Sequence, residues 1–420
     1  MKNFLIISCL LLSGFVAGAQ TRTVTVTNPA SVERKDELIV LKKDWLAKKL
    51  GKLSPGQFVT VSLKGVPQVV QYDDLNGDGQ WDEAVLLQDF NPREKVVFSI
   101  ARSNAPATVN AVTRAYVRQK HKMADDSFGS LITEDVMPFN NPNTDFSKQK
   151  LPPYLTEGPA WENDKVGFRK YFDIRNTNDI WGKRTPEMVL DHVGTNPANI
   201  YHHLSDWGMD ILKVGNSLGA GALAMQLYLN GKDTVIRFGR DVKKLSYKQI
   251  ANGPVRAVFE MRYEGWQYTP SVAPIDVTEQ ISIWGGQYFF ENKVTMKQVP
   301  AGAKLVTGTI DFFSEKDYKL SKGGVAGIYT YDKQSENKDM LGLGVLTAQK
   351  NIAGYAHLPA SGTGVTNTFA VMLIPKAAKP LVYRYYAAWE LTDKQFSSKQ
   401  GFEKFIDNEA IKLGNPLVLK

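Results

Sequence analysis

Short segments in which apolar and polar residues alternate recur along this chain and limit the folds that are open to it. Residues 21–27 and 58–63 both follow this pattern. Successive side chains of a strand point to opposite faces of a sheet, so a period of two predicts strands with one buried face. Similar runs predict further strands at residues 85–87, 95–100, 222–229, 234–238, 255–263, 275–284, 288–296, 303–310, 341–347, 368–374 and 382–389.

Helical periodicity is confined to residues 44–50 and 398–413. Residues 138–159 carry so many Asn, Pro and Gly residues that regular structure is not expected there. Two glycines, Gly285 and Gly286, separate a pair of predicted strands, which is typical of a hairpin. Long strands, tight turns and few helices predict a mostly β fold that is built as a large antiparallel β-sandwich.

The chain is long enough for two structural units. A linker is predicted where Pro106 and the polar stretch 120–126 follow the strand at 95–100. We therefore predict a small N-terminal β-module over residues 20–105 and a β-sandwich domain over residues 106–420. The larger domain would carry the catalytic or glycan-binding groups.

The first 19 residues have the three parts of a secretory signal peptide: the basic Lys2, an apolar run over 4–16 and small residues that end at Ala19. This signal would direct export to the periplasm or the medium, with cleavage near Ala19. No later run reaches the roughly 20 apolar residues of a transmembrane helix, so no membrane span is expected. Cys9 is the only cysteine and lies in the apolar run, so no disulfide is expected after cleavage.

The formal net charge is +8, and removal of Lys2 with the signal peptide leaves +7. The positive charges are spread along the chain rather than gathered in a basic run, and nucleic acid is not an expected partner of an exported protein. The surplus suits an anionic ligand such as a uronic acid or a sulfated glycan. A plain role in solubility explains it equally well.

Residues 201–219 concentrate groups that can move protons. This segment holds two of the five histidines, and its glycines favour a loop over a helix. We interpret it as the wall of a cleft; the alternative is a packed turn with a core indole and solvated histidines. Adjacent histidines on a strand point to opposite sides, so at most one is expected to face the cleft. The candidate residues are Tyr201, His202, His203, Trp207, Asp210 and Lys213, with His192 a short loop away.

Residues 158–173 combine aromatic rings with cations. Trp161 could stack on a sugar ring, and Arg169 could hold a carboxylate through two hydrogen bonds. Tyr171 would share a face with Arg169 if residues 168–173 form a strand. The alternative is that Trp161 belongs to the core and that Arg169 is paired inside the fold. Near the C-terminus, Arg384 and Glu390 share one face of a predicted strand that could line a groove.

Residues 73–83 are rich in Asp and Gly. Counted from Asp74, several positions match a calcium-binding EF-hand loop, but Val85 stands where that loop has a bidentate glutamate. The flanking residues predict strands, so we expect either a structural calcium site or a hairpin stabilised by Asx turns. No histidine spacing indicates a catalytic metal, and no catalytic cofactor is expected. The possible calcium ligands are Asp74, Asn76, Asp78 and Asp82.

Three motifs together resemble a secreted bacterial family known as domain of unknown function 4861. They are Asp-Leu-Asn-Gly-Asp-Gly-x-Trp-Asp-Glu at 74–83, Gly-Pro-Ala-Trp-Glu-Asn-Asp-x-x-Gly-Phe-Arg at 158–169 and Asp-Trp-Gly-Met-Asp-x-Leu-Lys-Val-Gly-x-Ser-Leu-Gly at 206–219. The resemblance implies work on polysaccharides and a supersandwich similar to that of galactose mutarotases and several polysaccharide lyases. It also implies a related activity, the removal of water from a terminal uronic acid of an oligosaccharide.

These observations lead to the hypothesis of a carbon–oxygen lyase that acts by β-elimination on uronic-acid-containing oligosaccharides. Arg169 or Lys213 would neutralise the carboxylate, His202 or His203 would be the base, and Tyr171 or Tyr201 would be the acid. Trp161 and Trp207 would stack on sugar rings. One alternative is a mutarotase-like epimerase that uses Glu279 or Glu390 as its base, and another is a noncatalytic glycan-binding protein. The sequence does not indicate an oligomeric state.

Overall fold

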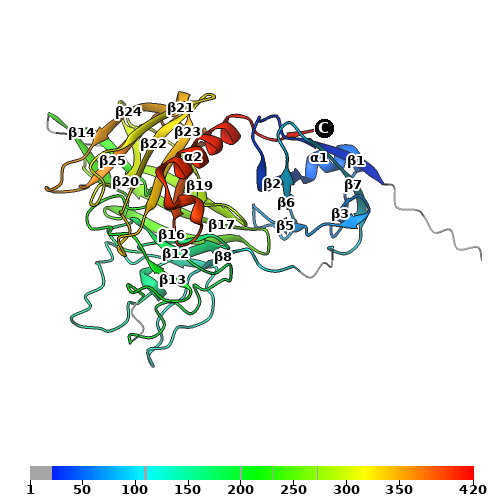
Figure 1. The fold of residues 1–420 in the computed structure, drawn as a ribbon. Helices are drawn as coiled ribbons and strands as arrows, with labels where there is room; N and C mark the ends of the chain where they lie inside the picture. The colour runs from blue at the N-terminus through cyan, green and yellow to red at the C-terminus, as the bar shows by residue number, and fades with distance from the viewer. Residues whose placement is uncertain (1–20, 108–110, 199–200, 230, 272) are drawn as a thin grey trace, which may run out of the picture.

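The computed structural model describes residues 21–107, 111–198, 201–229, 231–271 and 273–420 (Figure 1). The predicted signal peptide, residues 1–19, lies outside the described residues. The fold is mostly β, as predicted, and every pairing between named strands is antiparallel within these ranges. No helix among them is long and apolar enough to cross a membrane.

A small unit at the N-terminal end contains two sheets and one helix (Figure 1). The first sheet has the order β27 (Val418–Leu419), β1 (Arg22–Thr27), β7 (Lys95–Ser103), β3 (Phe58–Leu63) and β4 (Val66–Pro67). The second has the order β2 (Arg34–Lys42), β6 (Glu83–Phe90) and β5 (Gln71–Asp73), and helix α1 covers Lys43–Leu50.

The large unit is a two-layer sandwich. One layer is a nine-stranded sheet with the order β21 (Tyr318–Lys322), β22 (Val325–Asp332), β23 (Leu341–Ala348), β26 (Leu381–Trp389), β19 (Phe289–Met296), β18 (Ile275–Trp284), β17 (Arg256–Trp266), β16 (Val242–Asn252) and β9 (Glu134–Val136). Its strands β17 and β18 contact one five-stranded sheet, and β22 and β23 contact another.

The opposing layer consists of these two five-stranded sheets. The first has the order β13 (Gly208–Asp210), β12 (Asn178–Lys183), β11 (Val166–Lys170), β10 (Ala160–Asn163) and β8 (Ala115–Arg118). The second has the order β15 (Lys232–Arg237), β14 (Ala224–Leu229), β20 (Lys304–Ile310), β25 (Thr368–Leu373) and β24 (Ile352–His357). Apolar side chains from all three sheets form one continuous core.

The hairpin of β18 and β19 shows how alternation produces this core. Ile275, Val277, Ile281 and Ile283 are buried, and Asp276, Thr278, Gln280 and Ser282 between them are partly exposed. Burying each such side chain contributes about 1.5–3 kcal/mol relative to leaving it in water. The hairpin predicted around Gly285 and Gly286 is therefore confirmed, with β18 paired to β19 in antiparallel register.

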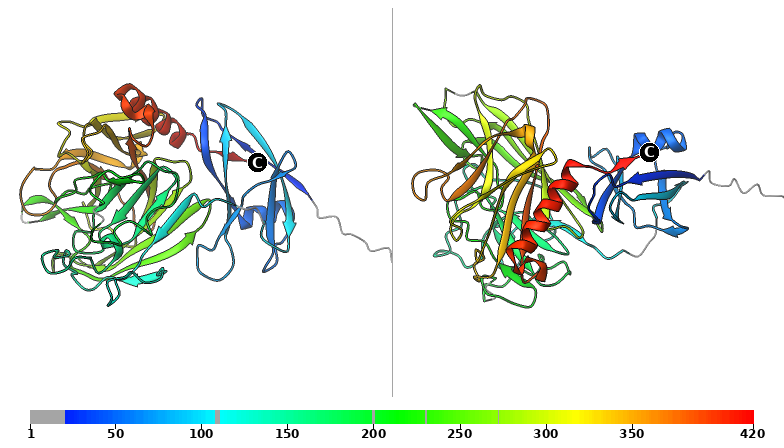
Figure 2. Two further views of the ribbon diagram at one scale, coloured as in Figure 1. Left: turned by 60° about the horizontal axis from the view of Figure 1, so that its bottom comes forward. Right: turned by 45° about the horizontal axis from the view of Figure 1, so that its top comes forward.

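Helix α2 (Lys399–Gly414) packs on the outer side of the nine-stranded sheet, as Figure 2 shows. Ser398 caps its first turn by accepting a hydrogen bond from the Gly401 N–H at 3.2 Å. Phe402 and Ile406 are fully buried against that sheet. Three short 3₁₀ helices complete the secondary structure: η1 (Leu155–Glu157), η2 (Gln349–Asn351) and η3 (Lys394–Ser397).

The structure differs from the domain prediction at the C-terminal strand, β27. Residues 418–419 were assigned to the large domain, but β27 pairs with β1 and extends the N-terminal sheet. Leu417 and Leu419 also pack against the N-terminal core, which explains why this pairing forms. The last residues therefore belong structurally to the small unit.

Candidate functional site

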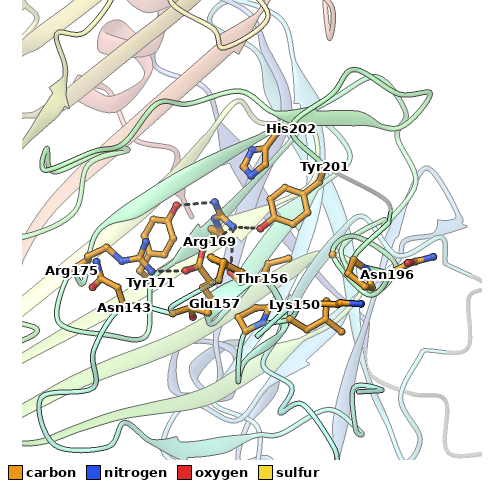
Figure 3. Close-up of a pocket in the computed structure, with 16 residues that line it drawn as sticks. Asn143, Lys150, Thr156, Glu157, Arg169, Tyr171, Arg175, Asn196, Tyr201 and His202 are labelled. Atoms are coloured by element: carbon orange, nitrogen blue, oxygen red, sulfur yellow. Dashed lines mark hydrogen bonds and ion pairs between the residues drawn. The ribbon is translucent and has the colours of Figure 1, made fainter. Parts of the chain in front are cut away.

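Two adjoining cavities open beside the sheet that contains β11, β12 and β13. Their volumes are about 440 and 550 Å³, and both lie in the range of small-molecule sites. We call the two together the cleft, because they share five lining residues: Asn143, Arg169, Tyr171, Arg175 and His202. Figure 3 shows the first cavity, with Arg169 at its centre.

Arg169 is the hub of a buried ionic cluster. Its Nη2 lies 2.6 Å from Asp179 Oδ2 and 2.8 Å from Asp210 Oδ2, and it also donates to the Tyr171 hydroxyl at 2.8 Å. The strand register explains the first contact, because Arg169 on β11 stands opposite Asp179 on β12. Glu157 approaches Arg169 Nη1 to 3.7 Å. The guanidinium is only 2% exposed, so its charge is compensated inside the fold.

Asp210 reaches this cluster because β13 lies unusually close to β12. Gly208 begins β13 with φ of 133°, and a Cβ at that position would stand 1.8 Å from the Gly182 carbonyl oxygen. Only glycine permits this approach. Burial and the adjacent Asp179 carboxylate hold the pKa of Asp210 well above its usual range, although Arg169 opposes the shift. This environment therefore favours the neutral, protonated form of Asp210.

A strained turn forms the floor of the cleft. Thr156 and Glu157 in η1 both have left-handed backbone conformations, with φ of 51° and 67°. Such conformations cost roughly 1–3 kcal/mol each outside glycine and cluster at functional sites. The buried Arg118 holds this turn, because its guanidinium donates to the Leu155 and Gly158 carbonyls and to Thr156 Oγ1.

The strained turn points Glu157 toward two arginines. Arg175 binds Glu157 at 2.7 Å and also pairs with Asp173. Figure 3 shows Glu157 below Arg169, with Arg175 to one side. Burial and the ion pairs of Glu157 therefore hold Arg169, Arg175 and their carboxylate partners in one rigid frame beneath the cleft.

His202 and Tyr201 stand over this frame. Their ring centroids lie 4.6 Å apart, and His202 Nδ1 lies 3.5 Å from Asp210 Oδ2. The Tyr201 hydroxyl accepts a hydrogen bond from Arg169 Nη1 at 3.4 Å, which leaves its own proton to be donated to a ligand. The His202 side chain is 56% exposed, so it is open to the cleft. Partial desolvation, reinforced by Arg169, lowers the pKa of His202.

The structure separates the two adjacent histidines. His202 lines both cavities, whereas His203 is exposed and lines neither. This arrangement agrees with the expectation that at most one of them faces the cleft. Lys213 borders the second cavity, where its ammonium lies 5.0 Å from the Phe312 ring centroid. His192 is exposed outside the cleft, so its predicted place in substrate binding is wrong.

Two of the predicted sugar-binding groups are structural. Trp161 is fully buried and packs against the rings of Phe168, Phe259 and Phe290, so it cannot stack on a sugar. Trp207 lies half-buried outside both cavities, where it packs edge-on against Trp181. Aromatic side chains bury large areas, and in these two cases that packing decides their position.

Arg169 also differs from its predicted role. The prediction had it free to grip a substrate carboxylate, but its hydrogen-bonding edge is occupied by Asp179, Asp210 and Tyr171. It instead positions the groups that line the cleft. Tyr171 is likewise engaged, because it donates to Asp179 Oδ2 at 2.7 Å.

The groove predicted near the C-terminus is not part of the cleft. Arg384 pairs with Glu291 at 3.0 Å, and the Glu390 carboxylate accepts from the Met340 N–H at 2.6 Å. Both side chains lie outside the two cavities. Glu279, the other proposed epimerase base, is fully buried and accepts hydrogen bonds from the Tyr263 hydroxyl and the Asn292 amide at 2.6 Å each.

The Asp-rich loop is stabilised by its own backbone. Asp74 accepts from the N–H groups of Gly77, Asp78 and Gly79, and Asp82 accepts from that of Leu75. Asn76 and Asp78 each accept from the N–H two residues ahead, which is the Asx-turn pattern. Over the described ranges, no group of three or more His, Cys, Asp or Glu residues is arranged to hold a metal ion.

Several residues of the cleft gave no signal in the sequence reasoning. Asp179 and Glu157 complete the ionic cluster, and Arg175 joins it from a loop. Phe146 and Lys150 line the first cavity from the Asn- and Pro-rich region that predicts no regular structure. The sequence did offer one clue to this cluster. Charged residues, Asp173, Arg175 and Asp179, stand among apolar and aromatic residues, and charges that become buried must find partners.

Sequence comparison finds a relative that matches nearly the whole of this chain. An uncharacterized protein, P7, from Formosa agariphila is 21% identical over 440 residues, which covers 99% of this chain and 98% of the relative.

Structural comparison finds matches that are only distantly related in sequence. A protein in the glycosyl hydrolase family 38 from Enterococcus faecalis superposes with a TM-score of 0.50 at 9% identity, over 95% of this chain and 47% of its own. An α-mannosidase from the same organism has a TM-score of 0.48 at 10% identity, and the match covers 95% of this chain and 46% of that protein. This chain thus spans about half the length of those proteins. The sequence model of the family described as a domain of unknown function (DUF4861) matches residues 26–419, and the chain belongs to that family.

Proposed function

We propose that this protein is a carbohydrate-active carbon–oxygen lyase that acts by β-elimination on uronic-acid-containing oligosaccharides. The observation that carries the proposal is the placement of His202 and Tyr201 side by side at an open cleft, above the rigid Arg169 cluster. The fold shared with a glycosyl hydrolase family 38 protein supports a sugar as the ligand.

The chemistry of elimination matches the groups that are present. The proton on the carbon beside a uronate carboxylate is acidic, and a neutral imidazole can remove it. The lowered pKa of His202 favours that neutral form. The oxygen that leaves from the next carbon needs a proton, which the Tyr201 hydroxyl can supply because burial raises its pKa and keeps it protonated. His202 is thus the base and Tyr201 the acid in this proposal.

The substrate carboxylate must also be neutralised, and this task falls to a lysine. Arg169 is already compensated by buried carboxylates, whereas Lys213 and Lys150 reach the cleft from its two cavities. An ammonium beside the carboxylate stabilises the extra negative charge that builds up as the carbon loses its proton. This interaction is strongest in the transition state, so it accelerates the reaction.

The two alternatives fit less well. A mutarotase-like epimerase with Glu279 or Glu390 as its base does not fit, because both carboxylates lie outside the cleft. A noncatalytic glycan-binding protein would use the same cleft without needing His202. It predicts saturable binding of an oligosaccharide with no change in the sugar.

A mass-spectrometric screen tests the proposal. The full-length protein is incubated with oligosaccharides of alginate, polygalacturonate, glucuronoxylan and chondroitin, and the products are analysed for chain cleavage with an unsaturated end or for loss of one water. Either product supports a lyase. An altered sugar of unchanged mass would support the epimerase, and binding without any product would support the glycan-binding protein.

The acid limb of the pH profile gives a sharper test of the base. Although the His202 ring is partly exposed, desolvation followed by the Arg169 charge lowers its pKa below the ordinary 6.5. A base must be unprotonated to act, so kcat/KM should fall as the pH drops through the pKa of His202, with a midpoint below 6.5. Initial rates measured from about pH 4 to pH 8 locate this limb. A midpoint above 6.5 would assign the limb to another group.

A further inference from the structure

The cleft has two arms that meet at the proposed catalytic groups. The first arm contains Phe146, Lys150 and Asn196, none of which lines the second cavity. The second arm contains Lys213, Asn216 and Glu336, none of which lines the first. In Figure 3, Lys150 and Asn196 lie on one side of Arg169, and Asn143 and Arg175, which border both arms, lie on the other.

The junction of the arms is the part of the cleft that can carry out chemistry. His202 and Tyr171 belong to both cavities, and the Arg169 cluster forms the floor between them. A group that reacts with His202 therefore has open space on two sides. Each cavity alone is large enough for a small-molecule ligand, so a single sugar ring would leave one arm empty.

Each arm also carries a lysine whose charge no described carboxylate neutralises. Lys150 and Lys213 have no carboxylate partner within the described part of the chain, in contrast to Arg169 and Arg175. Phe146 is 53% exposed at the first arm, where its ring can cover the apolar face of a sugar. This exposed ring, rather than Trp161 or Trp207, offers the cleft an aromatic surface for stacking on a sugar.

We propose that the cleft binds an oligouronide of at least two rings, with one carboxylate held by Lys150 in the first arm and another by Lys213 in the second. This inference rests on the proposed function for the identity of the sugar. The bond that reacts then lies at the junction, opposite His202. The protein would act on a linkage between two acidic rings, and a single uronic acid would be a poor substrate.

Substrate length combined with lysine variants tests this arrangement. Uronate oligomers of one to four rings, prepared from alginate and polygalacturonate, are assayed with the wild type, Lys150→Ala and Lys213→Ala. Lys148→Ala is the matched control, because Lys148 is 82% exposed, pairs with Asp145 and lies outside the cleft. Both kcat/KM and the dissociation constant from calorimetry are measured for each pair.

We expect both cleft variants to lose about tenfold in kcat/KM on oligomers of two or more rings, and Lys148→Ala to lose nothing. On a single uronic acid, at most one of the two lysines should matter. If turnover is absent but the dissociation constants show the same dependence on length and on both lysines, the two-arm inference holds and the lyase proposal fails. Three results would each overturn the inference. They are equal losses from both lysine variants on a single uronic acid, no loss from either variant at any oligomer length, and no binding of any oligomer.

Discussion

Replacing His202 with alanine is expected to lower kcat/KM on the uronate oligosaccharide by ~100-fold or more. The imidazole is the group of suitable pKa that faces both arms of the cleft, and its loss removes the proton acceptor without disturbing the buried cluster below. Because the side chain is 56% exposed, the thermal stability of the variant should stay close to that of the wild type. Initial rates and a thermal melt of both proteins measure the two effects.

His203→Ala is the matched control for this experiment. His203 neighbours His202 in the sequence but is exposed and lines neither cavity, so its replacement should leave kcat/KM within about twofold of the wild type. Equal losses in both variants would mean that the loop, not the imidazole, is responsible. Full activity of His202→Ala would remove His202 from the mechanism.

Replacing Arg169 with methionine is expected to be among the most damaging single changes to the fold. Methionine fills much of the space, but Asp179 and Glu157 would lose their buried counter-charge, and breaking a buried ion pair on one side costs about 3–5 kcal/mol. The midpoint of urea unfolding, followed by tryptophan fluorescence, should therefore fall markedly. Activity should disappear as well, because the cluster positions His202 and Tyr201.

An exposed arginine in the same domain provides the comparison. Arg262 lies on β17 and pairs with Glu260 at 2.6 Å, with its side chain 48% exposed. Such surface pairs contribute about 0–1 kcal/mol, so Arg262→Met should shift the unfolding midpoint only slightly. If Arg169→Met unfolds at the same urea concentration as Arg262→Met, the buried cluster does not stabilise the fold as argued here.

The sequence pattern predicts the strands whose buried positions are apolar, including the almost fully buried β23, and misses those whose buried positions carry charge. Strand β18 has the bounds that its alternation predicts, and β26 begins one residue before its predicted range. Strands β11 and β12 are buried at every position, and between them they contain Arg169, Lys170, Asp179 and Lys183. Charged residues normally indicate a solvated face, so a pattern rule cannot recognise strands whose charges are neutralised by partners distant in sequence.

The same limit applies to the candidate site. His202, Tyr201, Asp210 and Lys213 lie in one short segment, so composition alone could bring them together, and the structure places all four at the cleft. Glu157 and Asp179 join them only through the sheet register and the strained turn. The sugar-stacking role given to Trp161 failed for a related reason, because a large ring serves a core as readily as a ligand.

The pairing of β27 with β1 affects the order in which the protein can be assembled. Residues 418–419 complete a sheet whose other strands come from the first hundred or so residues of the chain. A chain that emerges from the ribosome N-terminus first can form most of the small unit early, since domains tend to fold as they are made. The edge of β1 nevertheless stays uncovered until residues 418–419 have been made. An unpaired edge strand invites pairing with other chains, so the nascent protein passes through a period in which aggregation competes with folding.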